Sequence, residues 1–304
     1  MEEGPPRHGH AVAVATEVFV AHRNLLFTVA YEMLGSAADA EDVLQESWLR
    51  WAEVDLETVR DGRSYLIRVV TRQALNRLRT MARRKEAYVG PWLPEPLLTS
   101  PDVAEDVELA ESLSMALMVV LETLTPTERA VFVLREVFDV GYDEIARSVD
   151  KSEAAVRQIA HRARKHVEAR QPRQPASAAQ ARTALASLQR ALETGDRQAF
   201  LDVLAPDVVY IGDGGGIRQA ALRPVVGADR IVRMVMGGLA KSGVIPTAEP
   251  SLVNGMPALV FRLDGELDGV LAARVGSTGI TGLYYVRNPE KLTRLGADTV
   301  VVRS

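Results

Sequence analysis

Six polar side chains near the middle of the chain have the types and spacing of a surface that binds DNA. They are Glu153, Arg157, Gln158, His161, Arg162 and Lys165. Arginine and lysine neutralise phosphates, while arginine and glutamine can form paired hydrogen bonds with base edges in the major groove. All six would share the outer face of one helix, so this set predicts DNA recognition.

The elements that would position these side chains form a helix-turn-helix over residues 142–164. Its apolar residues can pack between the two helices: Ile145, Ala146, Val149, Val156, Ile159, Ala160 and Ala163. Ser152 is suited to cap the second helix, whose first turns would meet the bases. The alternative is a surface helical hairpin whose charged face is only solvated.

A second basic set lies on a helix expected over residues 63–84. The core face of this helix would hold Leu66, Val70, Ala74, Leu78 and Met81. A separate stripe, roughly opposite, holds Arg68, Arg72, Arg79 and Arg83. Aligned arginines without an acid among them repel one another unless a phosphate backbone lies against them. The stripe therefore favours a nucleic acid over plain solvation.

A third set is acidic and lies on a helix expected over residues 39–51. Leu44, Trp48 and Trp51 recur at helical spacing and would be buried. Another face holds the polar residues Asp39, Asp42, Gln45 and Glu46. A negative helical face suits a basic protein partner, although by itself it is explained as readily by solubility.

Composition narrows the classes of function. The 304 residues suggest two or three domains, and the net charge of −4 argues against a chain-wide nucleic-acid coat. Any DNA binding must then be local. The chain has no cysteine, which excludes disulfides and thiolate chemistry. We expect no apolar run of membrane-spanning length, no metal or cofactor, and a cytoplasmic location.

Composition shifts along the chain predict six segments. We expect a flexible tail over 1–13, a helical domain over 14–88, a proline-rich and acidic linker over 89–107, a helix-turn-helix domain over 108–170, a short linker over 171–177 and a last domain over 178–304. The last domain would begin with helices over 178–193 and 200–204. Strands would follow over 208–211, 258–263, 269–275 and 280–286, as a helix followed by antiparallel strands of the α+β class.

Together these stretches resemble the extracytoplasmic-function (ECF) group of bacterial sigma factors. The motifs that carry the resemblance lie in family order over residues 14–170: Asp39 to Trp48, Tyr65 to Arg79, and Leu124 to Arg135 with the helix-turn-helix. The resemblance implies that the acidic set binds core RNA polymerase and that the six outward residues read the −35 element. It also implies that Arg68, Arg72, Asn76, Arg79 and Arg83 contact the −10 element.

The rest of the chain resembles ECF sigma factors with a fused SnoaL-like domain, the SigJ type. The signatures are Trp92-Leu-Pro-Glu-Pro96, Asp213-Gly-Gly-Gly216 and Asn288-Pro-Glu-Lys-Leu292. The resemblance implies two all-α sigma domains and a cone-shaped α+β domain that regulates them in cis, with no separate anti-sigma protein evident. We expect a regulatory contact among Trp92, Pro94, Pro96, Asp213, Gly214, Gly215, Gly216, Asn288 and Pro289. Two residues depart from the usual patterns: Ile217 replaces a family lysine, and Asp150 stands where such turns often carry glycine.

Two alternatives stay open. SnoaL-like folds include enzymes, and Asp213 could act as a base with Tyr210 or Tyr284, although its glycine neighbours more readily indicate a tight turn. An unidentified small ligand in the last domain is a second option. It would make the chain a ligand-sensing regulator with one helix-turn-helix, which would need neither the acidic helix nor the arginine stripe.

Overall fold

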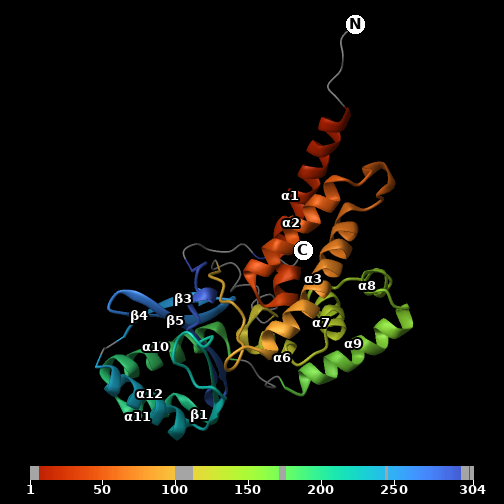
Figure 1. Ribbon diagram of the computed structural model, residues 1–304. Helices are drawn as coiled ribbons and strands as arrows, with labels where there is room; N and C mark the ends of the chain where they lie inside the picture. The colour runs from red at the N-terminus through yellow and green to blue at the C-terminus, as the bar shows by residue number, and fades with distance from the viewer. Residues whose placement is uncertain (1–6, 100–111, 171–175, 244–245, 296–300, 302–304) are drawn as a thin grey trace. The chain divides into compact units, whose positions relative to one another are not determined.

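The computed structural model describes residues 7–99, 112–170, 176–243, 246–295 and 301 (Figure 1). The chain divides into two compact units. The first unit is Met1–Arg83 with Leu121–Val167 and Val300–Ser304, and the second is Arg84–Val120 with Glu168–Thr299. The described part of the linker that we expected over 89–107 therefore belongs to the second unit, together with the last domain.

The first unit begins with three long helices. They are α1 (Arg7–Leu34), α2 (Ala37–Ala52) and α3 (Gly62–Glu86), with a short 3-10 turn, η1 (Leu56–Thr58), before α3. The Ser36 side chain caps α2 by accepting from the amide of Asp39. All five residues predicted for the core face of α3 are buried, and so are Leu44 and Trp51 of α2. Trp48 is only half-buried, with its ring edge against Phe19.

Helix α1 differs from expectation in two ways. It starts at Arg7, inside the stretch expected to be a flexible tail, and residues 1–6 lie outside the described part of the chain. Its segment Val12–Leu34 is also long and apolar enough to cross a membrane by length and composition, which corrects our expectation of no such run. A buried core helix passes the same test, and Leu26, Val29 and Leu34 are fully buried here.

The predicted helix-turn-helix is present in the first unit. It follows α7 (Pro126–Phe132) and the π-helical turn η2 (Val133–Val137), and it consists of α8 (Tyr142–Val149) and α9 (Glu153–Glu168). Thr125 and Glu128 form a capping box at the start of α7. Asp150 ends α8 with a φ of 55° and a ψ of 56°, the left-handed conformation expected of this turn residue. The Ser152 hydroxyl accepts from the amide of Ala155, as predicted for a cap.

A buried arginine joins the two halves of the first unit. Arg129 of α7 is 2% exposed, and its Nε and Nη2 atoms donate to the carbonyl oxygen of Glu32 in α1 at 3.1 and 2.9 Å. Its Nη1 atom donates to Glu122 at 2.6 Å. The guanidinium thus satisfies a carbonyl near the end of α1, where helices leave such groups without an intrahelical partner.

The second unit is built on a six-stranded sheet of order β2-β1-β6-β5-β4-β3. Its elements are α6 (Met115–Leu121), α10 (Ala178–Thr194), α11 (Arg197–Asp202), β1 (Leu204–Asp213), β2 (Val225–Val226), α12 (Ala228–Ser242), β3 (Thr247–Val253), β4 (Met256–Leu263), β5 (Glu266–Gly276), β6 (Gly279–Val286) and η3 (Pro289–Lys291). The four predicted strands are confirmed as parts of β1, β4, β5 and β6. The sequence did not predict β2, β3 or α12, and β1 pairs with β6 in parallel, so the sheet is mixed rather than antiparallel.

The two faces of this sheet are covered by different parts of the chain. Helices α10, α11 and α12 lie on one face (Figure 1), where Leu188, Phe200 and Ile231 pack on strand residues such as Phe261. The opposite face packs against α6 and against residues 88–99, which follow α3 and are called the inter-region segment below. Leu93 and Met115 share a core with Val260, Val270 and Val286. Neighbouring strand residues alternate between these two cores, as pleating requires. The domain is of the α+β class, and the inter-region segment with α6 covers the second face of its sheet.

Candidate regulatory contact and nucleic-acid interface

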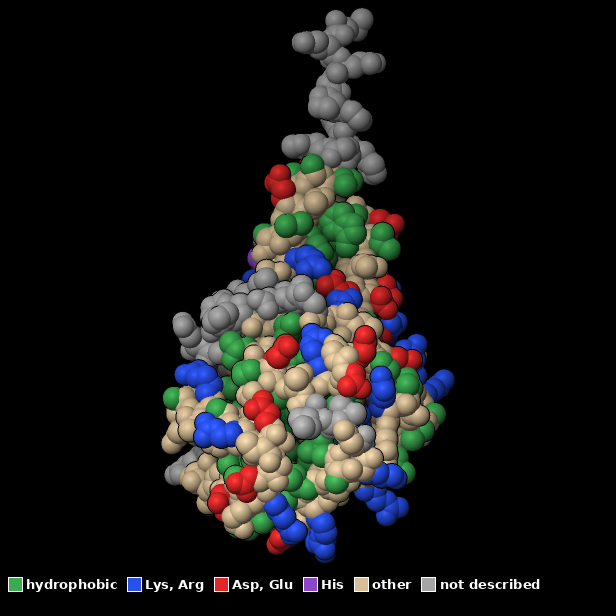
Figure 2. All heavy atoms as spheres, turned by 90° about the vertical axis from the view of Figure 1, so that its left-hand side faces the viewer, with side chains coloured by type: hydrophobic (Ala, Val, Ile, Leu, Met, Phe, Trp, Pro, Cys, Tyr) green, Lys and Arg blue, Asp and Glu red, His purple; other side chains and the backbone are tan. Residues whose placement is uncertain are grey.

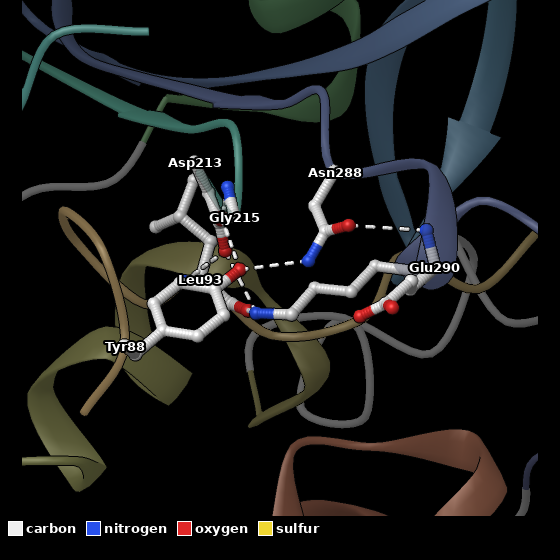
Figure 3. Close-up of polar contacts among 7 residues, drawn as sticks. Tyr88, Leu93, Asp213, Gly215, Asn288 and Glu290 are labelled. Atoms are coloured by element: carbon white, nitrogen blue, oxygen red, sulfur yellow. Dashed lines mark hydrogen bonds and ion pairs between the residues drawn. The ribbon is translucent and has the colours of Figure 1, made fainter. Parts of the chain in front are cut away.

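Asp213, at the end of β1, is the centre of a polar site against the inter-region segment (Figure 3). Its side chain is fully buried. The carboxylate accepts from the Tyr88 hydroxyl at 2.5 Å, the Leu93 amide at 2.8 Å and the Gly215 amide at 3.1 Å. A buried carboxylate is stable only when its charge and lone pairs are satisfied. The bonds from Tyr88 and Leu93 therefore hold this part of the inter-region segment in place.

Lys291 supplies the charge that balances Asp213. Its Nζ atom lies 2.7 Å from the Asp213 Oδ2 atom and donates to the Leu93 carbonyl oxygen at 2.6 Å. The same ammonium lies 3.3 Å from the centroid of the Trp92 ring and 4.9 Å from that of Tyr88. Lysine is rarely buried unless it is paired, and here a carboxylate, a carbonyl and two ring faces surround it.

Tyr88 and Asn288 complete the site. The Asn288 Nδ2 atom donates to the Tyr88 hydroxyl at 2.9 Å, and its Oδ1 atom accepts from the Glu290 amide at 3.0 Å (Figure 3). Burial raises the pKa of Tyr88 above its ordinary value, and the hydrogen bond to the Asp213 carboxylate raises that pKa further. Tyr88 therefore stays a neutral donor to Asp213.

The glycines after Asp213 are required by close contacts. A Cβ atom on Gly214 would lie 2.0 Å from the Arg218 carbonyl oxygen, and one on Gly215 would lie 2.4 Å from the Asn288 Nδ2 atom. Gly215 and Gly216 also have φ angles of +62° and +74°, which disfavour other residues. The run makes a tight turn against Asn288, as the glycines suggested, and it leaves no room for side chains.

The inter-region segment also extends the sheet edge near β3. Leu98 forms an antiparallel bridge with Val253. The Leu97 backbone amide donates to the Asn254 Oδ1 atom at 2.9 Å. The Asn254 backbone amide donates in return to the Leu97 carbonyl oxygen at 2.8 Å. The fully buried Leu97 and the buried Asn254 thus fix the second end of the strip that begins at Tyr88.

Most of the residues predicted for the regulatory contact lie within this strip or against it. Trp92 is half-buried, Pro94 and Pro96 are buried, and Pro289 opens η3 next to Lys291. Tyr88, Lys291 and Asn254 were not predicted. Lys291 belongs to a signature that we quoted without assigning the lysine a role. Ile217, at which we expected a departure from the family pattern, is exposed.

Asp213 is not arranged as a general base with the tyrosines considered above. Its phenol partner is Tyr88 of the inter-region segment. Tyr210 and Tyr284 instead lie in the two apolar cores of the sheet, and burial raises the pKa of Tyr210 to about 12. The carboxylate already accepts from four donor groups, so the geometry favours a structural anchor over a base.

The predicted −35 reading surface is exposed on α9: Glu153, Arg157, Gln158, His161, Arg162 and Lys165. Arg157 forms an ion pair with Glu153, and its guanidinium lies 4.4 Å from the centroid of the Tyr142 ring. Arg135 lies over the same ring at 4.9 Å. Tyr142 is thus contacted by two arginines, a role for this residue that the sequence did not suggest.

The predicted −10 residues differ in their surroundings on α3. Arg79 donates to Asn76 at 2.9 Å, and Arg83 is exposed. Arg68 is half-buried, with its guanidinium 4.9 Å from the centroid of the Tyr65 ring. Arg72 donates to the carbonyl oxygen of Arg147 in α8 at 3.0 Å, so part of the stripe contacts the helix-turn-helix.

The acidic face of α2 is paired in part with α3. Arg77 bonds to Asp39 at 2.6 Å and to Asp42 at 2.5 Å, and Gln73 donates to Glu46 at 3.1 Å. Asp39 is mostly covered by this pairing, whereas Asp42, Gln45 and Glu46 are exposed. The face that a partner could reach is therefore narrower than the sequence suggested.

Charge is mixed on one face of the molecule. Figure 2 shows Lys and Arg side chains interspersed with Asp, Glu and hydrophobic side chains. On that face neither sign forms a continuous field, in keeping with the net charge of −4. Binding to a polyanion would then depend on local surfaces such as those of α3 and α9.

Two family models match most of the first unit and all of α6. Residues 18–84 match Sigma-70 region 2, and residues 114–167 match Sigma-70, region 4. The first match covers α2, α3 and most of α1, which explains the apolar α1 as part of a sigma region. Together with the α+β domain, these regions define a sigma factor with a fused C-terminal domain.

The relatives agree with this class. The chain is 39% identical to the ECF RNA polymerase sigma factor SigJ of Mycobacterium tuberculosis, over 90% of this chain and 92% of that protein. It is 31% identical to the "Probable ECF RNA polymerase sigma factor SigI" of the same species, over 91% and 94% of the two chains. The crystal structure of the M. tuberculosis SigJ superposes with a TM-score of 0.73 at 35% identity, covering 92% of this chain and 98% of that one. The chain belongs to the ECF sigma factor family.

Proposed function

We propose that the chain directs RNA polymerase to promoters and that its SnoaL-like domain controls this activity in cis by holding the segment between the two sigma regions. In this proposal α9 reads the −35 element, α3 reads the −10 element, and the exposed acidic residues of α2 bind core polymerase in the cytoplasm.

The observation that carries the regulatory part is the seating of residues 88–99 on the second unit. The segment is held at one end by Asp213 and Lys291 and at the other by Asn254. Between these ends, Leu93 enters the apolar core on one face of the sheet. Because this segment joins region 2 to region 4, fixing it restricts the positions that the two regions can adopt.

In vitro transcription with core polymerase and a cognate promoter tests the proposal. Four chains are compared at equal concentration: the full chain, a chain that stops after residue 175, Trp92→Ala and Gly215→Val. The valine would clash with Asn288, because even a Cβ atom would lie 2.4 Å from its Nδ2 atom. Gly195→Ala is the matched control, since Gly195 also has a positive φ but nothing lies within 4 Å of an added Cβ atom. Equal transcription by all five chains would exclude regulation in cis.

The ligand-sensing regulator is less well supported. It requires only the helix-turn-helix, whereas residues 18–84 match Sigma-70 region 2. A small ligand of the α+β domain is compatible with the sigma factor role and would act through the same seated segment. The proposal includes no catalytic step, because the donors around Asp213 occupy the one carboxylate that we considered as a base.

A further inference from the structure

Asp268 occupies an irregular position in β5. Leu267 pairs with Arg262 and Gly269 pairs with Phe261, which leaves Asp268 as an extra residue without a partner on β4. Such a bulge turns a side chain out of the regular alternation and is a common way to aim it at a specific group. Here the carboxylate is aimed at Tyr285 of β6 and at Arg287, one residue beyond the end of that strand.

The bulged carboxylate holds Arg287 in one orientation. The Arg287 Nη2 and Nε atoms bond to the two Asp268 oxygens at 2.6 and 3.0 Å. The Tyr285 hydroxyl donates to Asp268 as well, at 2.6 Å. Asp268 is 6% exposed, so these are charge-assisted bonds in a poorly solvated place. Arg287 is therefore fixed from the side of β5.

Other atoms of Arg287 bond to both ends of the 213–219 loop, which contacts the inter-region segment through Asp213. Its backbone amide donates to the Asp213 carbonyl oxygen at 2.7 Å, at the start of the loop. Its Nη1 atom donates to the Gln219 carbonyl oxygen at 2.5 Å, at the far end. One residue thus closes both ends of the 213–219 loop, which contains the Asp213 carboxylate and the Gly215 amide.

Gly269 makes this arrangement possible. A Cβ atom there would lie 2.5 Å from the Val286 carbonyl oxygen, 2.8 Å from the Tyr285 ring and 3.1 Å from the Arg287 Cγ atom. The bare backbone lets both side chains cross β5 to reach Asp268. On the other side, the Tyr285 ring packs against Phe261 at 5.6 Å, so the network begins in the apolar core covered by the helices.

We propose that Asp268, Tyr285 and Arg287 form a positioning network that connects the helix-covered core of the α+β domain to the 213–219 loop and so sets how firmly the inter-region segment is held. None of the three contacts the segment in the bonds described here. They act on it through the loop. The network itself does not depend on the proposed function. Only its expected effect on transcription rests on that function.

Hydrogen exchange of the Leu93 amide in the full-length chain tests the network, because that amide donates to Asp213. Arg287→Met removes the charge and all side-chain donors while keeping an apolar stem. We expect exchange at Leu93 to accelerate by about ten- to a hundredfold, the factor that corresponds to one lost hydrogen bond to a charged group. Amides of β4 should exchange at the wild-type rate.

Two further variants make the result specific. Asp268→Asn should accelerate Leu93 exchange in the same direction, and adding it to Arg287→Met should have little extra effect, because the two residues form one network. Arg274→Met is the matched control: Arg274 also bridges β5 and β6, bonding to Thr281 at 3.1 Å, but none of its described hydrogen bonds reaches the loop. Arg287→Lys should restore part of the protection.

The outcomes separate this inference from the proposed function. Wild-type exchange at Leu93 in Arg287→Met, or equal acceleration in Arg274→Met, would overturn the network. If Arg287→Met does not fold, exchange at Leu93 in the milder variant Asp268→Asn is measured instead, and a wild-type rate there would likewise overturn the network. Faster exchange at Leu93 with unchanged transcription would support the network and count against regulation in cis.

Discussion

The ammonium group of Lys291 lies 3.3 Å from the centre of the Trp92 ring while it pairs with Asp213 at 2.7 Å. One lysine therefore bonds to the α+β domain and to the segment between the sigma regions at once. The pair is deeply buried, with side-chain exposures of 8% for Lys291 and 0% for Asp213.

Lys291→Met should destabilise the second unit by about 3 kcal/mol, because it leaves a buried carboxylate without its counter-charge. Urea unfolding of the full chain, followed by circular dichroism, measures the loss. Asp213→Asn added to Lys291→Met should recover part of the stability, since the amide carries no charge. A double variant no more stable than Lys291→Met would show that the ion pair is not the source of the effect.

The seating of the segment should withstand alkaline pH up to the range in which free tyrosine titrates. The folded-state pKa of Tyr88 lies above its ordinary value of 10.0, through burial first and then the bond to Asp213. For a raised pKa the stabilisation is fully present below the ordinary value and is lost as pH rises through the folded value. The tyrosinate absorbance of the wild type minus that of Tyr88→Phe should show no step near pH 10. An increase in this difference near pH 10, equal to the ionisation of one tyrosine, would contradict the contact between Tyr88 and Asp213.

Tyr142 should position Arg157 for base reading. Tyr142→Leu removes the ring that contacts Arg157 at 4.4 Å, and we expect weaker preference at one base pair of the −35 element, by about 1 kcal/mol or less for an exposed cation–ring contact. Tyr142→Phe keeps the ring and should keep the preference. Binding of the holoenzyme to a library of −35 variants measures both. An equal loss of binding to all −35 variants would mean that Tyr142 supports the fold and does not contribute to base recognition.

The exposed acids of α2 should govern polymerase binding. Asp42→Arg with Glu46→Arg reverses two charges and should slow association with core polymerase, because charges at the rim of an interface mainly set encounter rate and partner choice. Asp143→Arg is a control on α8, outside the acidic face. Association is measured at two salt concentrations, and the defect should shrink at the higher one. If the double variant associates at the wild-type rate, α2 is not part of the interface with core polymerase.

Local patterns predicted the helical regions well. The core face of α3 and the packing residues of the helix-turn-helix follow from helical spacing alone, because each helix must bury one apolar stripe. The left-handed Asp150 and the Ser152 cap follow from the chemistry of single residues. These features depend on neighbours in sequence, so the sequence is enough.

The contacts of the second unit depend on residues far apart in the chain. Tyr88 meets Asp213 and Asn288 across 125 and 200 positions, and no periodicity connects them. The short edge strand β2 and the half-exposed β3 carry weak alternation, and the parallel pairing of β1 with β6 is invisible in either strand alone. The resemblance identified the signature that contains Lys291, but not the bonds that this lysine makes to Asp213 and Leu93.

The bonds between α1, α3 and the helix-turn-helix have a consequence for the start of transcription. Arg129 ties α7 to Glu32, and Arg72 ties α3 to Arg147. Promoter elements at −35 and −10 are about 25 base pairs, or about 85 Å of duplex, apart. Helices that stay bonded to one another would not span that length, so under the proposed function we expect these bonds to break before α3 and α9 contact both elements. The buried Arg129 would then influence how often the protein is ready to bind a promoter.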